Sequence, residues 1–117
     1  MDNGAERIAR ERRRQLEKLG YTAKYDNSHR GGELAIAAAC YAAAAGGLRI
    51  YTENRRANTV AFSDPWPWPR DVMSDARPHS GNVVSVPRRI SERIRLLEKA
   101  GALIAAEIDR LLRRGGQ

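Results

Sequence analysis

Residues 90–112 of the chain read ISERIRLLEKAGALIAAEIDRLL. Apolar residues and one glycine recur here in alternating steps of four and three: Ile90, Ile94, Leu97, Gly101, Ile104, Ile108 and Leu111. A repeat of this kind places its members along one side of an α-helix, as in a coiled coil. Because Pro87 suits the first turn of a helix, the pattern predicts a helix from about residue 87 to residue 114, of which about 25 helical residues span roughly 37 Å.

Such a helix is longer than the diameter of a small domain, and the chain has 117 residues with only two Trp, four Tyr and one Phe to fill a core. We therefore expect a homo-oligomer that buries the apolar side of helix 87–114 between chains. Gly101 lies in the middle of this helix, where glycine costs about 1 kcal/mol relative to alanine. Its presence predicts that another backbone approaches closely there.

The rest of the chain predicts two further helices and a hairpin. Residues 5–19 are strong helix formers, and residues 33–45 form an alanine-rich helix that Gly46-Gly47 ends. Since small side chains let other helices surround it, we expect the alanine helix at the centre. Residues 48–52 and 58–62 are typical of short strands, and 70–86 of a flexible loop. The predicted fold is a single domain over 1–117, mainly α, with a three-helix core, a long C-terminal helix and a small β-hairpin.

Composition favours anionic partners. Lys and Arg number 21 against 14 Asp and Glu, for a net charge of +7, and most of the basic residues are arginines, whose planar fork pairs with phosphate. The longest apolar run, 34–45, is too short to span a bilayer, and residues 1–14 lack the apolar segment of a secretory signal. A single Cys40 within an apolar stretch favours a reducing compartment, so we expect a cytoplasmic protein without membrane contact.

The segment DPWPWP, residues 64–69, is the most suggestive element for function. Three prolines stiffen it, so that Trp66 and Trp68 can be displayed for stacking on a nucleotide base. Four nearby arginines are candidates to clamp its phosphates: Arg55, Arg56, Arg70 and Arg77. The alternative is that the two tryptophans are a core plug that covers the helices, since the chain has few other large side chains.

Several motifs together resemble a widespread family of small, mostly uncharacterised phage and prophage proteins. Its members share an E-R-x-R-Q helix, a D-D-x-H-x-x-G-E-L-A-x-A-A segment, a W-P-W motif often followed by W-W-K-P, and a closing K-A-G-A-L-I-x-A-E-I helix. Matching positions here are Glu11, Arg12, Arg14, Gln15, Asp26, His29, Gly32, Glu33, Trp66, Trp68 and Lys99 to Ile108. Asn27 replaces the second Asp, and no W-W-K-P follows the tryptophans. The resemblance implies a phage origin and no established activity.

Two polar groups are further candidates for a site. Asp26, His29 and Glu33 are spaced so that they could converge at the start of the alanine helix, as a metal site, a helix-capping network or a ligand contact. An all-helical nucleotide pyrophosphohydrolase would hold Mg²⁺ through carboxylates, for which the candidates are Glu33, Glu107 and Asp109. No paired E-E-x-x-E motif supports that enzyme, and Cys40 is expected to be buried and inert.

Duplex nucleic acid is a third class of partner, supported by charge alone, because no helix-turn-helix signature is present. The arginines of residues 5–19 alternate with glutamates, which favours a solvated face of ion pairs along that helix. The leading hypothesis is an oligomer that binds a small phosphorylated nucleotide without turnover, as a phage sponge for a host immune signal. Its expected ligand contacts are Trp66, Trp68, His29, Arg55, Arg56, Arg70, Asp26 and Glu33, with no cofactor, or Mg²⁺ if the protein is the enzyme.

Overall fold

A computed structural model describes residues 2–17, 32–69 and 74–115. Helix α1 spans Gly4–Glu17, α3 spans Glu33–Ala45 and α4 spans Ile90–Gly115. The prediction of a mainly α fold with a long C-terminal helix and a small hairpin is confirmed. The alanine helix has the predicted bounds, and α4 begins three residues after the proline that predicted its start.

The strands form two separate antiparallel hairpins. Strand β1 (Thr52–Arg56) pairs with β2 (Thr59–Ser63), and the shorter β3 (His79–Ser80) pairs with β4 (Val83–Val84). The first hairpin was expected at 48–52 and 58–62, so its first strand begins later than predicted and its turn is tighter. Ala57 provides the turn with a positive φ of 49°, which suits a two-residue hairpin loop although alanine rarely adopts it. The second hairpin lies within the segment that we expected to be a loop.

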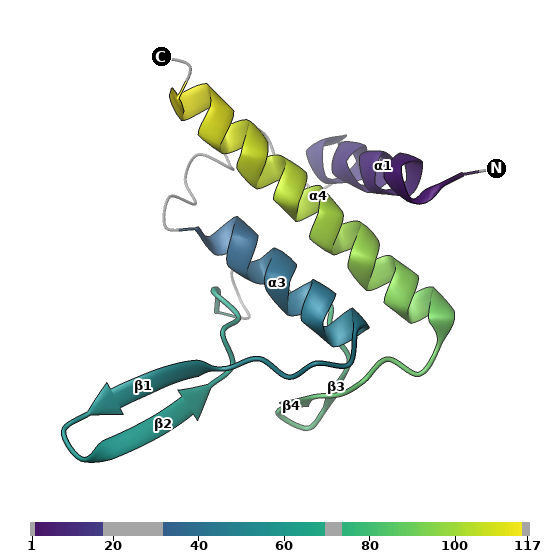
Figure 1. Cartoon of the computed structure of the whole chain (residues 1–117). Helices are drawn as coiled ribbons and strands as arrows, with labels where there is room; N and C mark the ends of the chain where they lie inside the picture. Colours follow the sequence, from purple (N-terminus) through teal and green to yellow (C-terminus); the bar gives the residue numbers. More distant parts are fainter. Residues whose placement is uncertain (1, 18–31, 70–73, 116–117) are drawn as a thin grey trace.

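Helix α4 takes the central position, between α1 and α3 (Figure 1). We expected the alanine helix there, and that expectation is wrong. Helix α3 buries one side, with Leu34, Ala37 and Tyr41, while Ala35 and Ala39 on its other side stay exposed. Alanines let α3 pack closely on a neighbour, but the longer α4 has enough surface to receive one helix on each flank.

The core lies between α3 and α4 and is closed by Trp68. On the side of α4 it contains Leu96, Ala100, Leu103 and Ala106. Most of these side chains are small, which allows the two helices to approach closely. The tryptophan therefore supplies much of the apolar volume that a core of alanines lacks.

Helix α1 crosses α4 at Gly101, where the side chain of Ile8 fills the space. A Cβ atom on Gly101 would lie only 2.6 Å from Cδ1 of Ile8. The sequence predicted that a backbone would approach this glycine closely; in the structure the contact is made by a side chain. Glycine at this position lets α1 pack onto α4.

Ion pairs join α1 to α4 around the buried carboxylate of Glu11. Its Oε1 accepts a hydrogen bond from Nη1 of Arg95 at 2.7 Å, and its Oε2 lies 3.8 Å from Nζ of Lys99. On the exposed edge, Nε of Arg7 donates to Glu98 at 2.7 Å. We expected the charges of this helix to pair along its own solvated face. Several pair with α4 instead, because α1 packs directly on that helix.

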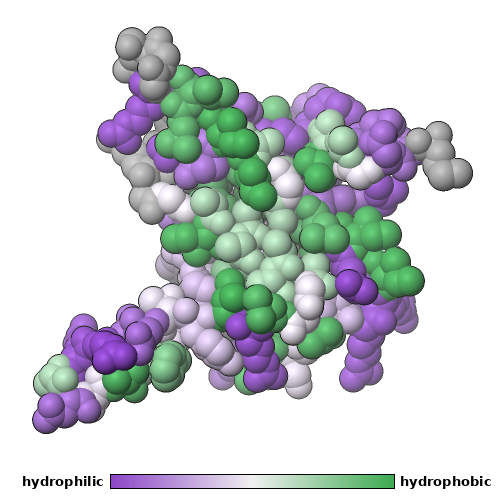
Figure 2. All heavy atoms as spheres, in the orientation of Figure 1, coloured by the Kyte–Doolittle hydropathy of each residue, from purple (hydrophilic) through white to green (hydrophobic). Residues whose placement is uncertain are grey.

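The heptad residues of α4 lie on an open face of the single chain. The exposed fraction is 74% for Ile90, 49% for Leu97 and 48% for Ile104. Figure 2 shows apolar side chains gathered along this face of α4, beside the paler alanines of α3. The side chains that the helix buries against α1 and α3 belong to other positions. The predicted repeat is present, and in one copy of the chain it is left uncovered except at Gly101, which Ile8 of α1 covers.

Candidate ligand pocket

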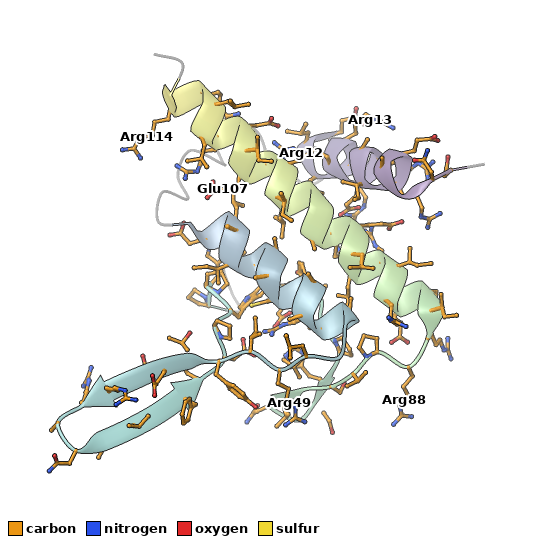
Figure 3. The ribbon with its side chains drawn as sticks, in the orientation of Figure 1. Arg12, Arg13, Arg49, Arg88, Glu107 and Arg114 are labelled. Carbon is orange, nitrogen blue, oxygen red and sulfur yellow. The ribbon has the colours of Figure 1, made fainter. Side chains whose placement is uncertain are left out.

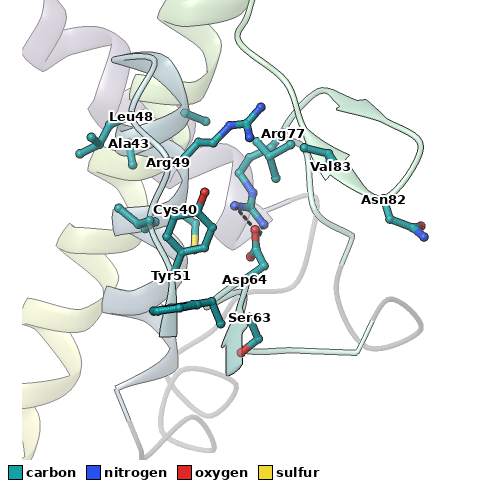
Figure 4. A pocket seen from close by; sticks show the side chains of 14 residues that line it. Cys40, Ala43, Leu48, Arg49, Tyr51, Ser63, Asp64, Arg77, Asn82 and Val83 are labelled. Carbon is teal, nitrogen blue, oxygen red and sulfur yellow. Dashed lines mark hydrogen bonds and ion pairs between the residues drawn. The ribbon is translucent and has the colours of Figure 1, made fainter. Parts of the chain in front are cut away.

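A pocket of about 270 Å³ lies where the end of α3 meets the two hairpins (Figure 4). Its walls come from α3, residues 48–51, the end of β2 with the residue that follows it, and the β3–β4 hairpin. Ligand pockets in proteins commonly measure about 300–1,000 Å³, so this one suits a small ligand. Residues 48–51, which we expected in a strand, line this pocket before β1 begins.

Two aromatic side chains form the outer wall of the pocket. The rings of Tyr51 and Phe62 have centroids 6.1 Å apart and meet edge to face at 67°. Both side chains are more than half exposed. Leu48, Val83 and Val84 add aliphatic surface beside them. An exposed aromatic pair at the mouth of a pocket offers a surface on which a flat ring can pack.

The pocket floor carries a buried guanidinium that two carboxylates hold. Arg77 has a side chain only 4% exposed, and its Nη2 lies 2.8 Å from Oδ1 of Asp64 and 2.6 Å from Oδ2 of Asp75. A second bond runs from Nη1 to Asp64 at 3.0 Å, which makes this pair bidentate. The guanidinium also lies 5.4 Å from the ring centroid of Trp66. Arg77 is thus a structural centre that joins the two hairpins.

These contacts shift the pKa of both partners. Burial by itself lowers the pKa of Arg77, but the hydrogen bonds that Arg77 donates to Asp75 and Asp64 outweigh it and hold that pKa above its ordinary value. Burial by itself raises the pKa of Asp64, whereas Arg77 and the backbone N–H of Trp66 bring it below its ordinary value of 3.8. Both groups are therefore charged at neutral pH.

The lowered pKa of Asp64 predicts a specific loss of stability in acid. A carboxylate whose pKa is lower in the folded state stabilises the fold above its unfolded pKa, and this contribution disappears as the pH falls through the folded value. The wild type should therefore have a higher free energy of unfolding than Asp64→Asn. This difference should stay constant near neutral pH and shrink below about pH 4. Urea unfolding of both proteins across this range measures it. A difference that does not change with pH would contradict the ion pair.

Cys40 lies at the inner end of the pocket and is completely buried. Burial raises the pKa of its thiol to about 11, so the thiolate is scarce at neutral pH. The expectation of a buried cysteine is confirmed. This side chain contributes apolar surface to the pocket and is poorly suited to act as a nucleophile.

Arg49 supplies the pocket with a positive charge that is free to pair. Its side chain is exposed, it lines the pocket, and among the described residues it makes no hydrogen bond or ion pair. It enters the site directly after Leu48 in the segment that follows α3 (Figure 4). A guanidinium in this position can bind an anionic group on a ligand whose ring occupies the pocket.

The tryptophans predicted as a displayed strip are packed inward. Trp68 is 9% exposed and belongs to the core, and Trp66 lies against it with ring centroids 5.5 Å apart. Tyr41 covers Trp66 from α3 at 5.2 Å. The prediction that these rings are displayed for stacking on a base is therefore not met. Their packing favours the alternative that they are a core plug. The prolines stiffen the strip, but the alanine helix beneath it needs large side chains to cover it.

The other predicted ligand contacts are dispersed or fall outside the described residues. Arg55 pairs with Glu53 on the exposed β1 strand, and Arg56 lies at the end of that strand; neither lines the pocket. Glu33 is the first residue of α3. Asp26, His29 and Arg70 lie outside the described residues. The arginine clamp around the tryptophans is therefore not formed by Arg55 and Arg56, while Arg77 meets Trp66 but is occupied by carboxylates.

Two of the carboxylates suggested for Mg²⁺, Glu107 and Asp109, each face an arginine. Oε1 of Glu107 accepts a hydrogen bond from Nε of Arg110 at 2.5 Å, and Asp109 lies 3.8 Å from Arg12. Over residues 2–17, 32–69 and 74–115, no group of three or more acidic, His or Cys side chains is placed to hold a metal ion. Glu107 thus pairs within α4, and Asp109 lies within ion-pair distance of α1.

Exposed arginines lie on several sides of the molecule rather than on one face. Figure 3 shows Arg13 on α1, Arg88 just before α4 and Arg114 near the end of α4, which point away from the body at separate edges. A duplex-binding surface requires basic side chains that follow one backbone path. These three arginines do not lie along one such path.

Sequence reasoning missed Tyr51, Phe62 and Arg49 as site residues. The two aromatic residues flank a hairpin whose register pairs Thr52 with Ser63, and this register brings their rings together. A correct prediction of the two-residue turn would have revealed their proximity.

Comparison with known protein families, with curated proteins and with solved structures found no match for this chain. None of the helices in the described ranges has the length and apolar character needed to cross a membrane. The fold and the pocket define a small, mainly α protein that carries an aromatic-walled pocket at one end of its alanine helix.

Proposed function

We propose that this protein binds a small phosphorylated nucleotide in the pocket beside α3 and does not turn it over. The observation that carries the proposal is the combination of an exposed aromatic pair, Tyr51 and Phe62, with the unpaired guanidinium of Arg49 in one small pocket. The base packs on the aromatic wall, and Arg49 binds the phosphate. The proposed site differs from the tryptophan strip that the sequence suggested. The proposed ligand is of the same class, a small phosphorylated nucleotide.

Binding without catalysis is supported by the state of the reactive groups in the pocket. Asp64 is held by two hydrogen bonds from Arg77, so it is a weak base for activating water. The thiol of Cys40 is protonated at neutral pH because its pKa is about 11. The side chains that line the pocket thus suit recognition of a ligand.

A phage origin would suggest a biological role for such binding. If the resemblance to small phage proteins reflects kinship, the protein acts in the host-cell cytoplasm and sequesters a nucleotide that the host uses as an immune signal. A sponge of this kind needs affinity and abundance, and it releases its ligand unchanged when it is denatured. The same property separates it from a pyrophosphohydrolase.

Arg49→Ala should weaken nucleotide binding by about tenfold or more, because it removes a charge-assisted hydrogen bond to the phosphate. The matched control is Arg88→Ala, which removes the same charge from an exposed position outside the pocket. A thermal-shift screen of the wild type against linear and cyclic nucleotides identifies the ligand, and calorimetric titration of both variants measures the loss.

Three outcomes would contradict the proposal. The first is that no nucleotide raises the melting temperature. The second is that Arg88→Ala loses as much affinity as Arg49→Ala, and the third is that the nucleotide is recovered cleaved. Release of pyrophosphate that depends on Mg²⁺ would indicate the enzyme instead. Duplex DNA binding that falls steeply between low and moderate salt would indicate a nucleic-acid-binding protein.

A further inference from the structure

We propose that a second copy of this chain covers the apolar face that α4 and α3 leave open, so that the protein is a homodimer with α4 packed on its counterpart. The heptad side chains form the centre of this face, and their exposed fractions range from 38% for Ile94 to 74% for Ile90. Figure 2 shows the paler alanines of α3 beside them, and the exposed residues of that helix include Ala35 and Ala39. This inference concerns a surface separate from the ligand pocket.

The chemistry of the face suits a protein interface. At the heptad positions from Ile90 to Leu111 other than Gly101, which contacts Ile8 of α1, α4 presents only Ile and Leu to solvent, while the charges of its middle turns lie on the flank that meets α1. Depletion of charge at the centre and charged residues along the border are typical of the buried part of an interface. A surface helix of a single-chain protein normally places polar residues here.

The heptad spacing of the apolar residues on this face favours a second copy of α4 as the partner. Apolar residues that repeat every 3.5 residues over three heptads are matched along their whole length by a helix that carries the same repeat. Among the described helices, α4 is the one with this repeat, since α1 and α3 span 14 and 13 residues. A two-fold axis brings this same surface of two copies together.

The size of the face comes close to what a specific dimer needs. From Ile90 to Leu112, α4 extends about 33 Å, and with a helix width of about 10 Å its footprint is about 330 Å². That already equals the largest apolar patch of many single-chain proteins, about 300–600 Å². With the alanines of α3, contact between two copies approaches the roughly 1,000 Å² of total buried surface that a specific interface needs.

Ile104→Glu tests the interface, because it places a charge at the centre of the face. We expect the wild type to sediment at micromolar concentration as a particle of twice the 13.0 kDa chain mass. We expect Ile104→Glu to weaken association by about a hundredfold or more and to sediment as a single chain with unchanged helical circular dichroism. Ile104 is half exposed in the single chain, so the substitution leaves the core intact.

The matched control is Val60→Glu, which adds the same charge at a similarly exposed position on β2, away from the face. This variant should remain dimeric. A wild type that sediments as a single chain would overturn the proposal, and so would an Ile104→Glu variant that stays dimeric. If Ile104→Glu fails to fold, the mass of the unsubstituted protein decides alone. Nucleotide binding by a monomeric variant would leave the proposed function intact, so the two proposals fail separately.

Discussion

Arg77→Met is expected to lower the free energy of unfolding by about 3 kcal/mol. The substitution keeps most of the side-chain volume and leaves Asp75, whose side chain is 11% exposed, without its partner. Removal of one member of a buried ion pair typically costs about 3–5 kcal/mol, because the remaining charge is desolvated and unpaired. We expect the lower end of this range because the other carboxylate, Asp64, is 43% exposed and can recover water.

The control for this prediction is Arg55→Met. Arg55 pairs with Glu53 at 3.0 Å, but both side chains are exposed, so the same substitution should cost less than about 1 kcal/mol. Adding Asp75→Asn to Arg77→Met should recover part of the loss, since it removes the unpaired charge. Urea unfolding of the four proteins measures these differences. Equal losses for Arg77→Met and Arg55→Met would show that Arg77 does not join the two hairpins.

Gly101→Ala is expected to destabilise the protein by about 1–2 kcal/mol, although alanine favours a helix interior by about 1 kcal/mol. The added Cβ would lie within 3 Å of three carbon atoms of Ile8, including both that branch from its Cβ. Because a β-branched side chain has few alternative rotamers, Ile8 cannot move aside alone and α1 must shift on α4.

A double substitution tests the cause of this loss. In a protein that carries Ile8→Ala the clash is absent, so Gly101→Ala should become stabilising by up to about 1 kcal/mol. Gly46→Ala is the control, because its nearest neighbouring atom would lie 3.6 Å from the new Cβ, and its effect should stay below about 1 kcal/mol. Thermal unfolding of the set measures the coupling. A Gly101→Ala effect that is the same in both backgrounds would refute the contact with Ile8.

The helices could be predicted from the sequence because their signals are local. Glu33 and the Gly46-Gly47 pair mark the two ends of α3, and the heptad repeat identifies most of α4. Their packing could not be predicted, since an alanine-rich helix gives no indication of which side it buries. The exposed alanines of α3 show that small side chains permit a central position without requiring it.

The turn of the first hairpin was predicted too long because Ala57, the first residue of its two-residue turn, is not a usual turn residue. Ala57 adopts a positive φ without being Gly, Asn or Asp, so the sequence carries no clear turn signal at that point. The second hairpin does contain a signal that we missed: Gly81-Asn82 separates β3 from β4, and Gly81 has a φ of 63°.

The candidate site depends on contacts between distant segments, which spacing alone does not reveal. Arg77 meets Asp64 across 13 positions of the chain, and the pocket forms only when both hairpins pack at the end of α3. The tryptophans were the most visible aromatic motif, yet they pack into and against a core that has few other large side chains. The less conspicuous Tyr51 and Phe62 remain available to a ligand.

The most direct test of the proposed function is a nuclear magnetic resonance titration of the full chain with the nucleotide that gives the largest thermal shift. We predict that the largest chemical-shift changes fall on Arg49, Tyr51, Phe62 and Val83, and that Trp68 and the exposed residues of α1 change little. Changes that cluster elsewhere, or no saturable change with any nucleotide, would contradict the account.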